Sequence, residues 1–163
     1  PIGKISDRDE RLLRYAKSAL YRGIGAVKAG VKVTEIGKTI ETYAGAMGFV
    51  VNKSFFGHGI GAQMHEEPMI PHFDIGLEEI KETVNGRTKY KYKERDNIPV
   101  LYEGQIICIE PMVTYRDFIG VKSDDGWTVR TRAGRKSAMF EHMIKVTSLG
   151  CEILTTHINE EVK

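Results

Sequence analysis

Three well-separated segments of the chain carry side chains of the types that bind divalent metal ions. His58 stands in the glycine-rich stretch GHGIG, Glu110 in IEPM and Glu141 in FEHM. One imidazole and two carboxylates suit borderline-hard cations such as Zn, Co, Mn and Fe(II). A histidine between glycines is more often a turn residue, so each segment is weak evidence alone. The prediction of a metal site depends on the fold bringing the three together.

Both glutamates interrupt apolar runs that are typical of inner strands. Glu110 follows the four apolar residues 106–109, and strand alternation would place it on the same face as Cys108. Glu141 stands in a second apolar run, after Phe140. A buried carboxylate costs several kcal/mol unless it is paired or bound to a metal. An ion pair with a lysine would satisfy either glutamate singly, but two such acids in neighbouring strands indicate a shared cation.

His65 is the next candidate for chemistry, because it follows His58 closely in the chain. It could donate a proton or a hydrogen bond to a polarised carbonyl near the metal, or be an ordinary surface-loop histidine. The other histidines lack such a context and are read as structural or solvated: His72, His142 and His157. Trp127, the only tryptophan, could line an apolar pocket or be a core aromatic.

Two amphipathic helices precede these segments. Apolar residues recur with helical period from an N-cap at Ser6 to an end near Gly30. A second helix is predicted between an N-cap at Thr34 and a stop at Gly48.

Strand signals follow the helices. β-Branched and aromatic residues predict strands over 49–56, 105–113, 127–132, 139–146 and 151–154. Helices first and antiparallel strands afterwards predict an α+β fold in which the two helices cover one face of the sheet.

A charged segment, residues 74–100, separates the histidine motif from the first glutamate motif. Asn85-Gly86 lies at its centre, and Asn-Gly between alternating residues is a strong hairpin signal. The segment is therefore predicted to be an exposed β-hairpin. Its alternating lysines and tyrosines would suit contact with RNA near a ribosome exit site, but the interspersed acids favour a solvated hairpin.

Composition excludes several classes of protein. The chain has 163 residues and 41% hydrophobic residues, enough for one globular domain. Lys and Arg total 24 against 22 Asp and Glu, which disfavours a dedicated nucleic-acid binder. Cys108 and Cys151 have no CxxC spacing, so neither a disulfide framework nor a thiolate zinc site is predicted. Without a run of ~20 apolar residues or a signal-peptide core, we expect no membrane contact and a cytoplasmic location.

Longer motifs give a resemblance to a known family. GHGIGAQMHEEPMI (57–70), GQIICIEPMV (104–113) and DGWTVRTRAGRKSAMFEHMIKVTSLGCEILT (125–155) resemble type I methionine aminopeptidases, metallopeptidases of the pita-bread (creatinase/aminopeptidase) fold. DGWTV and SAxFEH favour this subfamily over prolidase and aminopeptidase P. The resemblance implies that residues 1–163 form the C-terminal portion of a single peptidase catalytic domain. It also implies that the N-terminal half of the fold is absent and that the hairpin of residues 74–100 is an insertion.

The same resemblance implies a metal centre. His58, Glu110 and Glu141 match three of five ligands for two divalent ions (Co, Mn, Fe, Zn or Ni), with Glu141 bridging them. The two aspartate ligands of the family lie upstream of this chain, and neither Asp7 nor Asp9 can replace them. We therefore expect weak metal binding and no activity from this chain alone. The missing half is expected as a separate or an upstream segment.

Substrate contacts are also implied by the resemblance. His65 matches the histidine that contacts the scissile amide, and Met64 and Trp127 match the lining of the methionine side-chain pocket. Met64 departs from the usual phenylalanine, although a thioether still packs well against methionine. The implied function is metal-dependent removal of the initiator methionine from nascent proteins. The alternatives are a catalytically inactive pita-bread protein that binds protein or RNA and, more weakly, an Xaa-Pro peptidase.

Overall fold

Two helices open the chain in the computed structural model, which describes residues 1–84, 87–116 and 120–156. Helix α1 (Asp7–Gly25) begins at the predicted cap, where the Ser6 hydroxyl accepts a hydrogen bond from the backbone N–H of Asp9. It ends at Gly25 rather than near Gly30, and the chain then turns toward helix α2 (Val33–Ala46).

The predicted N-cap of α2 is wrong. Lys32 is the capping residue and makes no side-chain cap, while Thr34 lies inside the helix and its hydroxyl donates to Asp74. The reason is tertiary: the backbone N–H of Val33 donates to the Pro99 carbonyl, and Lys32 forms a β-bridge with Val100. A neighbouring segment of main chain therefore satisfies a helix-end donor that a threonine cap would otherwise satisfy.

The strands that carry the site form two antiparallel sheets. One has the order β1-β7-β10 and the other the order β12-β11-β6-β2-β3. The three-stranded sheet consists of β1 (Val50–Val51), β7 (Met112–Thr114) and β10 (Ser137–Met139). The five-stranded sheet consists of β12 (Cys151–Ile153), β11 (His142–Val146), β6 (Ile106–Ile109), β2 (Gly57–Gly59) and β3 (Glu66–Ile70).

Two of the predicted strands are broken at the glutamates. The run 105–113 divides into β6 and β7, which belong to different sheets, and the run 139–146 divides likewise into β10 and β11. The residues left between the strands include Glu110 and Glu141, so neither glutamate lies within a strand as predicted. Pro111 contributes to the first break because it has no N–H for a ladder bond. Both breaks lie at the same level, since β6 pairs with β11 and β7 pairs with β10.

The predicted strand over 49–56 is also shorter than expected. Only Val50 and Val51 pair, with Thr114 and Val113 of β7. The side-chain carbonyl of Asn52 then accepts a hydrogen bond from the backbone N–H of Ser54, and this local contact turns the chain out of the sheet.

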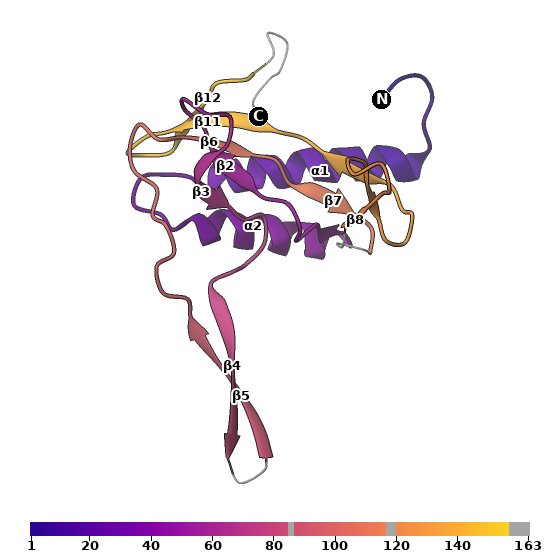
Figure 1. The fold of residues 1–163 in the computed structure, drawn as a ribbon. Coiled ribbons are helices and arrows are strands. Elements are labelled where there is room, and N and C mark those ends of the chain that lie inside the picture. Colours follow the sequence, from indigo (N-terminus) through magenta and orange to yellow (C-terminus); the bar gives the residue numbers. More distant parts are fainter. Residues whose placement is uncertain (85–86, 117–119, 157–163) are drawn as a thin grey trace.

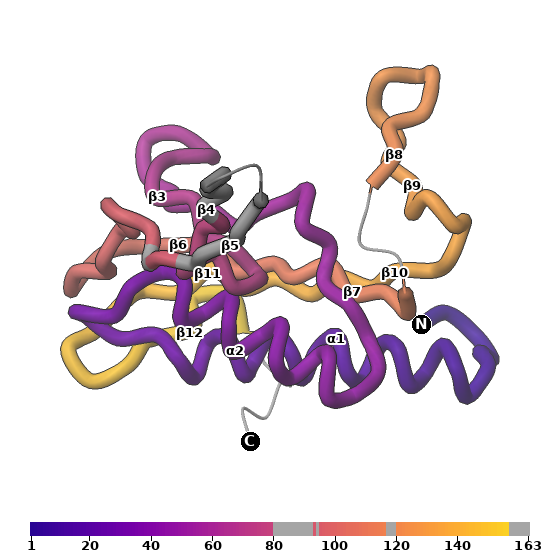
Figure 2. Tube along the Cα trace, turned by 90° about the horizontal axis from the view of Figure 1, so that it is seen from below, coloured from indigo at the N-terminus to yellow at the C-terminus, as the bar shows by residue number. Residues whose placement is uncertain are grey.

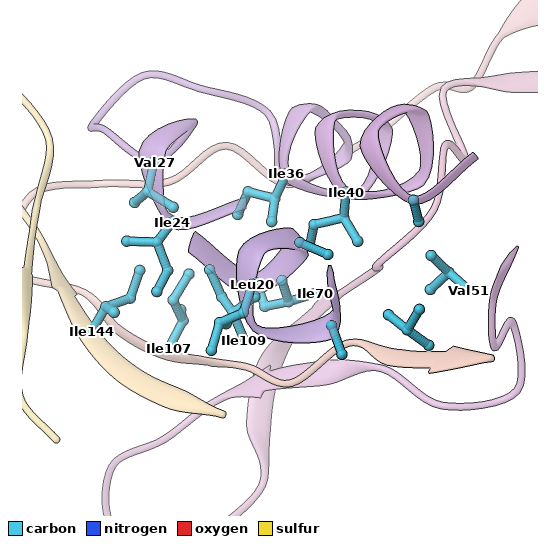
Figure 3. Close-up of a cluster of buried hydrophobic side chains, with 14 of the residues drawn as sticks. Leu20, Ile24, Val27, Ile36, Ile40, Val51, Ile70, Ile107, Ile109 and Ile144 are labelled. Atoms are coloured by element: carbon cyan, nitrogen blue, oxygen red, sulfur yellow. The ribbon is translucent and has the colours of Figure 1, made fainter. Parts of the chain in front are cut away.

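The two helices pack on one side of β6 and β7 (Figures 1 and 2). Figure 3 shows the apolar side chains that fill the space between the layers, among them Leu20, Ile24, Ile36, Ile40, Ile70, Ile107, Ile109 and Ile144. The helices approach closely at Gly23, where a Cβ would lie 2.6 Å from Cδ1 of Ile40. The core therefore fixes the sheet from the helical side and leaves its other side for the site.

Two hairpins extend from this body. Strands β4 (Leu77–Val84) and β5 (Arg87–Glu94) pair over their full length and project away from the two layers (Figure 1). Their predicted turn, Asn85-Gly86, lies outside the described residues. Strands β8 (Gly120–Lys122) and β9 (Val129–Thr131) form the second hairpin on the side opposite the helices (Figure 2). Among the described residues, no helix combines the length and apolar character needed to cross a bilayer.

Candidate metal centre

His58 is held on an inner strand of the five-stranded sheet. It lies on β2, with Cys108 of β6 opposite it on one side and Met69 of β3 on the other. A Cβ on Gly57 would lie 2.1 Å from the Cys108 carbonyl oxygen, so only glycine lets β2 approach β6 this closely. The motif therefore uses glycine to place a histidine on an inner strand, not in a turn.

The imidazole of His58 has a defined orientation. Its Nδ1 lies 2.9 Å from the carbonyl oxygen of Gly59, and since a carbonyl oxygen only accepts, Nδ1 carries the hydrogen. The lone pair is then on Nε2, which lies 3.4 Å from Oε1 of Glu110. A metal-binding histidine needs this arrangement, in which one ring nitrogen is anchored by the protein and the other is free to bind.

Glu110, which follows β6, and Glu141, which precedes β11, lie near each other. Burial raises the pKa of the Glu110 carboxyl, the negative charge of Glu141 raises it further, and His58 opposes the shift. Two neighbouring carboxylates repel each other unless a cation lies between them. Imidazole nitrogen with two carboxylates is a donor set for a divalent cation, so the residues present fit the metal that the sequence implies.

Cys108 lies in the same group, although the spacing of the two cysteines predicted no thiolate site. One ligand atom each of His58, Cys108 and Glu141 lie within 4.8 Å of one another. Burial, together with a hydrogen bond to Glu141 and the charges of Glu141 and Glu110, raises the pKa of the Cys108 thiol to about 12. Strand alternation places Cys108 on the same face as Glu110. This alternation, and not CxxC spacing, is the sequence signal for a cysteine near the site.

His72 contacts the backbone of Glu110, although the sequence did not single it out. It is only 1% exposed, and its Nε2 accepts a hydrogen bond of 3.1 Å from the backbone N–H of Glu110. Burial lowers the pKa of His72 to about 3, so the ring is neutral and Nε2 remains an acceptor. His72 therefore fixes the backbone from which the Glu110 carboxylate extends.

His142 supports the other glutamate in a similar way. It is buried, with Nε2 3.0 Å from the Tyr21 hydroxyl of α1 and Nδ1 3.0 Å from Oγ1 of Thr155. The same Thr155 oxygen accepts the backbone N–H of Met143. The residues after Glu141 are thus tied to a helix and to the end of β12. His157 lies outside the described residues.

His65 lies beside His58 in a hollow on the open side of the sheet. Their ring centroids are 4.3 Å apart with an edge-on arrangement, and the His65 ring is exposed. The hollow has a volume of about 490 Å³. Its lining comprises Ser54, Phe55, Phe56, Gly57, His58, His65, Glu66, Glu67 and Met69. An aromatic and thioether lining next to imidazoles can accept an apolar side chain beside a polar reacting group.

The two other predicted substrate contacts are placed differently. Met64 adjoins His65 in the chain and its side chain is 70% exposed. Trp127 lies in the turn between β8 and β9, where its backbone N–H donates to the Asp125 carboxylate and its side chain is 88% exposed. Trp127 therefore does not line the hollow that the described residues form. Its role in a methionine pocket stays a prediction.

Comparison with known proteins gives the family. The model of metallopeptidase family M24 matches residues 1–148. The chain is 37% identical to a methionine aminopeptidase of Salmonella typhimurium, over 99% of this chain and 54% of that protein. It is 36% identical to methionine aminopeptidase 1 of Bacillus subtilis, over 95% of this chain and 55% of that protein. The chain thus spans about half the length of these curated relatives.

Solved structures give the fold. A crystal structure of the methionine aminopeptidase from Thermotoga maritima matches with a TM-score of 0.79 and 31% identity, covering 96% of this chain and 55% of that one. An X-Pro aminopeptidase from the same organism matches at 22% identity with a TM-score of 0.63, covering 98% of this chain and 34% of that one, which shows a shared fold alone. The predicted α+β pita-bread architecture is confirmed, and the chain belongs to metallopeptidase family M24.

Proposed function

We propose that this chain provides the metal-binding half of a methionine aminopeptidase, which removes the N-terminal methionine of nascent proteins. The observation that carries the proposal is the convergence of His58, Glu110 and Glu141 from three segments on one side of the sheet. Similarity to methionine aminopeptidases over almost the whole chain supports the choice of substrate.

His58, Glu110 and Glu141 would hold the metal, with Glu141 in the bridging position of a two-ion site. A bound divalent cation supplies Lewis acidity and makes water nucleophilic near neutral pH. Nε2 of His58 is oriented as a donor by the Gly59 carbonyl, and the His72 acceptor fixes Glu110. These contacts hold the donor atoms before the cation binds, which limits the reorganisation that binding requires.

His65 is proposed as the catalytic residue that donates a hydrogen bond to the carbonyl oxygen of the scissile amide. Its exposed ring beside His58 can reach a carbonyl in the hollow, where negative charge develops during hydrolysis. Met64 and Trp127 are proposed to contact the methionine side chain, Met64 from the loop before His65 and Trp127 from the β8–β9 hairpin. Both side chains are exposed and therefore available to a substrate.

The two remaining ligands and the rest of the substrate site are proposed to come from an N-terminal half, as a separate chain or as upstream sequence. The length of the relatives supports this, because this chain covers only 54% of the first. A groove of about 1200 Å³ along α1 has both apolar and charged residues in its lining, among them Leu13, Phe140 and Arg14, and offers a surface for such a segment. Work on nascent chains implies a cytoplasmic location. The β4–β5 hairpin is proposed as an inserted, solvated element, with contact to the ribosome as the alternative.

Hydrolysis of Met-Ala-Ser with added Co(II) or Mn(II) tests the proposal. Because no activity is expected from this chain alone, the upstream half of the fold is supplied in every assay. The wild-type chain is compared with Glu141→Ala and with the control Glu152→Ala, an exposed glutamate on β12 of the same sheet. Loss of hydrolysis in Glu141→Ala alone supports the proposal. Equal activity in both variants would exclude Glu141 from the site. Cleavage of Ala-Pro peptides instead of Met-Ala-Ser would indicate an Xaa-Pro peptidase. No hydrolysis after the upstream half is supplied would favour an inactive binding protein.

A further inference from the structure

We infer that Cys108 is an additional ligand of this metal centre and binds the cation through its thiolate, together with His58 and Glu141. The inference rests on the proposed metal site and adds a soft donor that its histidine and carboxylates do not provide. Its basis is the cluster in which ligand atoms of the three residues lie within 4.8 Å of one another.

The strand register directs the Cys108 side chain to the site. Cys108 and His58 are directly opposite each other in the β2–β6 ladder, and side chains of opposite residues extend from the same face of a sheet. The next residue on that face of β6 and its continuation is Glu110, whose carboxylate contacts His58. The register thus brings the thiol to the face that carries His58 and Glu110, and Glu141 comes from the segment between β10 and β11.

The surroundings of the thiol are those of a ligand rather than of a core side chain. A structural cysteine acts as a small apolar residue and packs among other apolar groups. Cys108 is buried, yet its Sγ lies within 4.8 Å of ligand atoms of His58 and Glu141, which are polar neighbours. A bound cation would take the place of the thiol proton, which would be released to solvent. The thiolate and the carboxylates of Glu110 and Glu141 would then offset most of the charge of two divalent ions.

A thiolate in the donor set changes which metal the site prefers. Soft sulfur ligands favour Co(II), Zn(II) and Cd(II) over Mn(II), whereas carboxylates suit Mn(II). We expect replacement of Cys108 by serine to weaken Cd(II) binding about tenfold or more while changing Mn(II) binding less than about threefold.

Cobalt absorption provides the direct test, because a thiolate ligand gives a sulfur-to-cobalt charge-transfer band in the near ultraviolet that nitrogen and oxygen ligands do not. The 163-residue chain is titrated with Co(II) alongside Cys108→Ser and Cys151→Ser. Cys151 is the matched control, since its Sγ lies 3.6 Å from the Ile24 carbonyl oxygen, away from the site. The expected result is a band in the wild type and in Cys151→Ser, and no band in Cys108→Ser.

The Cys151→Ser variant decides the question even when Cys108→Ser does not fold. The chain has two cysteines, so Cys108 is then the sole thiol and any sulfur band must come from it. Calorimetric Co(II) binding that depends on Glu141 but shows no band would overturn the thiolate and leave the metal centre standing. Absence of Co(II) binding would overturn both. Loss of the band in Cys151→Ser would show that Cys151 binds the cobalt and would overturn the assignment to Cys108.

Discussion

Replacement of His72 by leucine should reduce the free energy of unfolding at neutral pH and raise it in acid. Leucine is close to histidine in size but cannot accept the backbone N–H of Glu110, which then loses this partner in a part-buried position. An orphaned buried donor costs about 1–3 kcal/mol. At pH 7 the variant should be less stable than the wild type by that amount.

The acid side follows from the pKa of His72, which burial lowers from 6.5 to about 3. The unfolded chain therefore takes up a proton at higher pH than the folded chain does. The contribution of neutral His72 is complete above about pH 6.5 and is lost as the pH falls toward 3, by about 1.4 kcal/mol per pH unit. Leucine does not titrate, so this loss is absent from the variant, and the two stability curves should cross near about pH 5.

Urea unfolding of the metal-free chain at a series of pH values measures the difference between wild type and variant. The difference is the useful quantity, since other groups titrate in the same range. Glu110 is one of them, and its raised pKa stabilises the folded state as the pH falls. His72→Gln is the control, because its carbonyl can accept the Glu110 N–H but does not titrate. A wild-type-minus-leucine difference that stays constant from pH 7 to pH 4 would refute the reasoning.

Three further substitutions test other parts of the structure. Gly57→Ala should destabilise the chain by about 1–3 kcal/mol or more in thermal unfolding, because its Cβ has no space against β6, whereas Gly25→Ala, with nothing within 4 Å, should not destabilise it. Tyr21→Phe should lower the free energy of unfolding by about 1 kcal/mol, because the hydroxyl contact with His142 is lost; an unchanged melting temperature would show that this contact does not stabilise the fold. Trp127→Ala should change stability by less than about 0.5 kcal/mol because the ring is exposed, while raising KM for methionyl peptides in the complete enzyme; an unchanged KM would exclude it from the substrate pocket.

Local patterns predicted the elements that depend on local physics. The period of apolar residues and the Ser6 cap located α1, and the Asn-Gly pair located the hairpin whose strands run from Leu77 to Val84 and from Arg87 to Glu94. The cap of α2 was missed because its donor is satisfied by residues near Pro99, which are distant in sequence. A local sequence pattern cannot indicate a hydrogen-bond partner that is so distant in the chain.

The sequence predicted which residues form the site but not how the strands position them. Glu110 and Glu141 were identified because each stands inside an apolar run. The runs do not indicate that the chain passes from one sheet to the other at each glutamate. His72 and His142 have no distinctive neighbours in sequence, and only the fold shows that they hold the main chain beside the glutamates. Cys108 was dismissed on spacing, because a ligand supplied across a strand pair leaves no sequence motif.

The most direct test of the central claim is calorimetric titration of the chain with Co(II), comparing the wild type with Glu110→Gln, Glu141→Gln and the control Glu152→Gln. Glutamine preserves size while removing the charge that a divalent cation requires. We predict saturable binding that is at least about tenfold weaker in each of the first two variants and unchanged in Glu152→Gln. Equal binding by all four proteins would contradict the assignment of a metal centre to His58, Glu110 and Glu141.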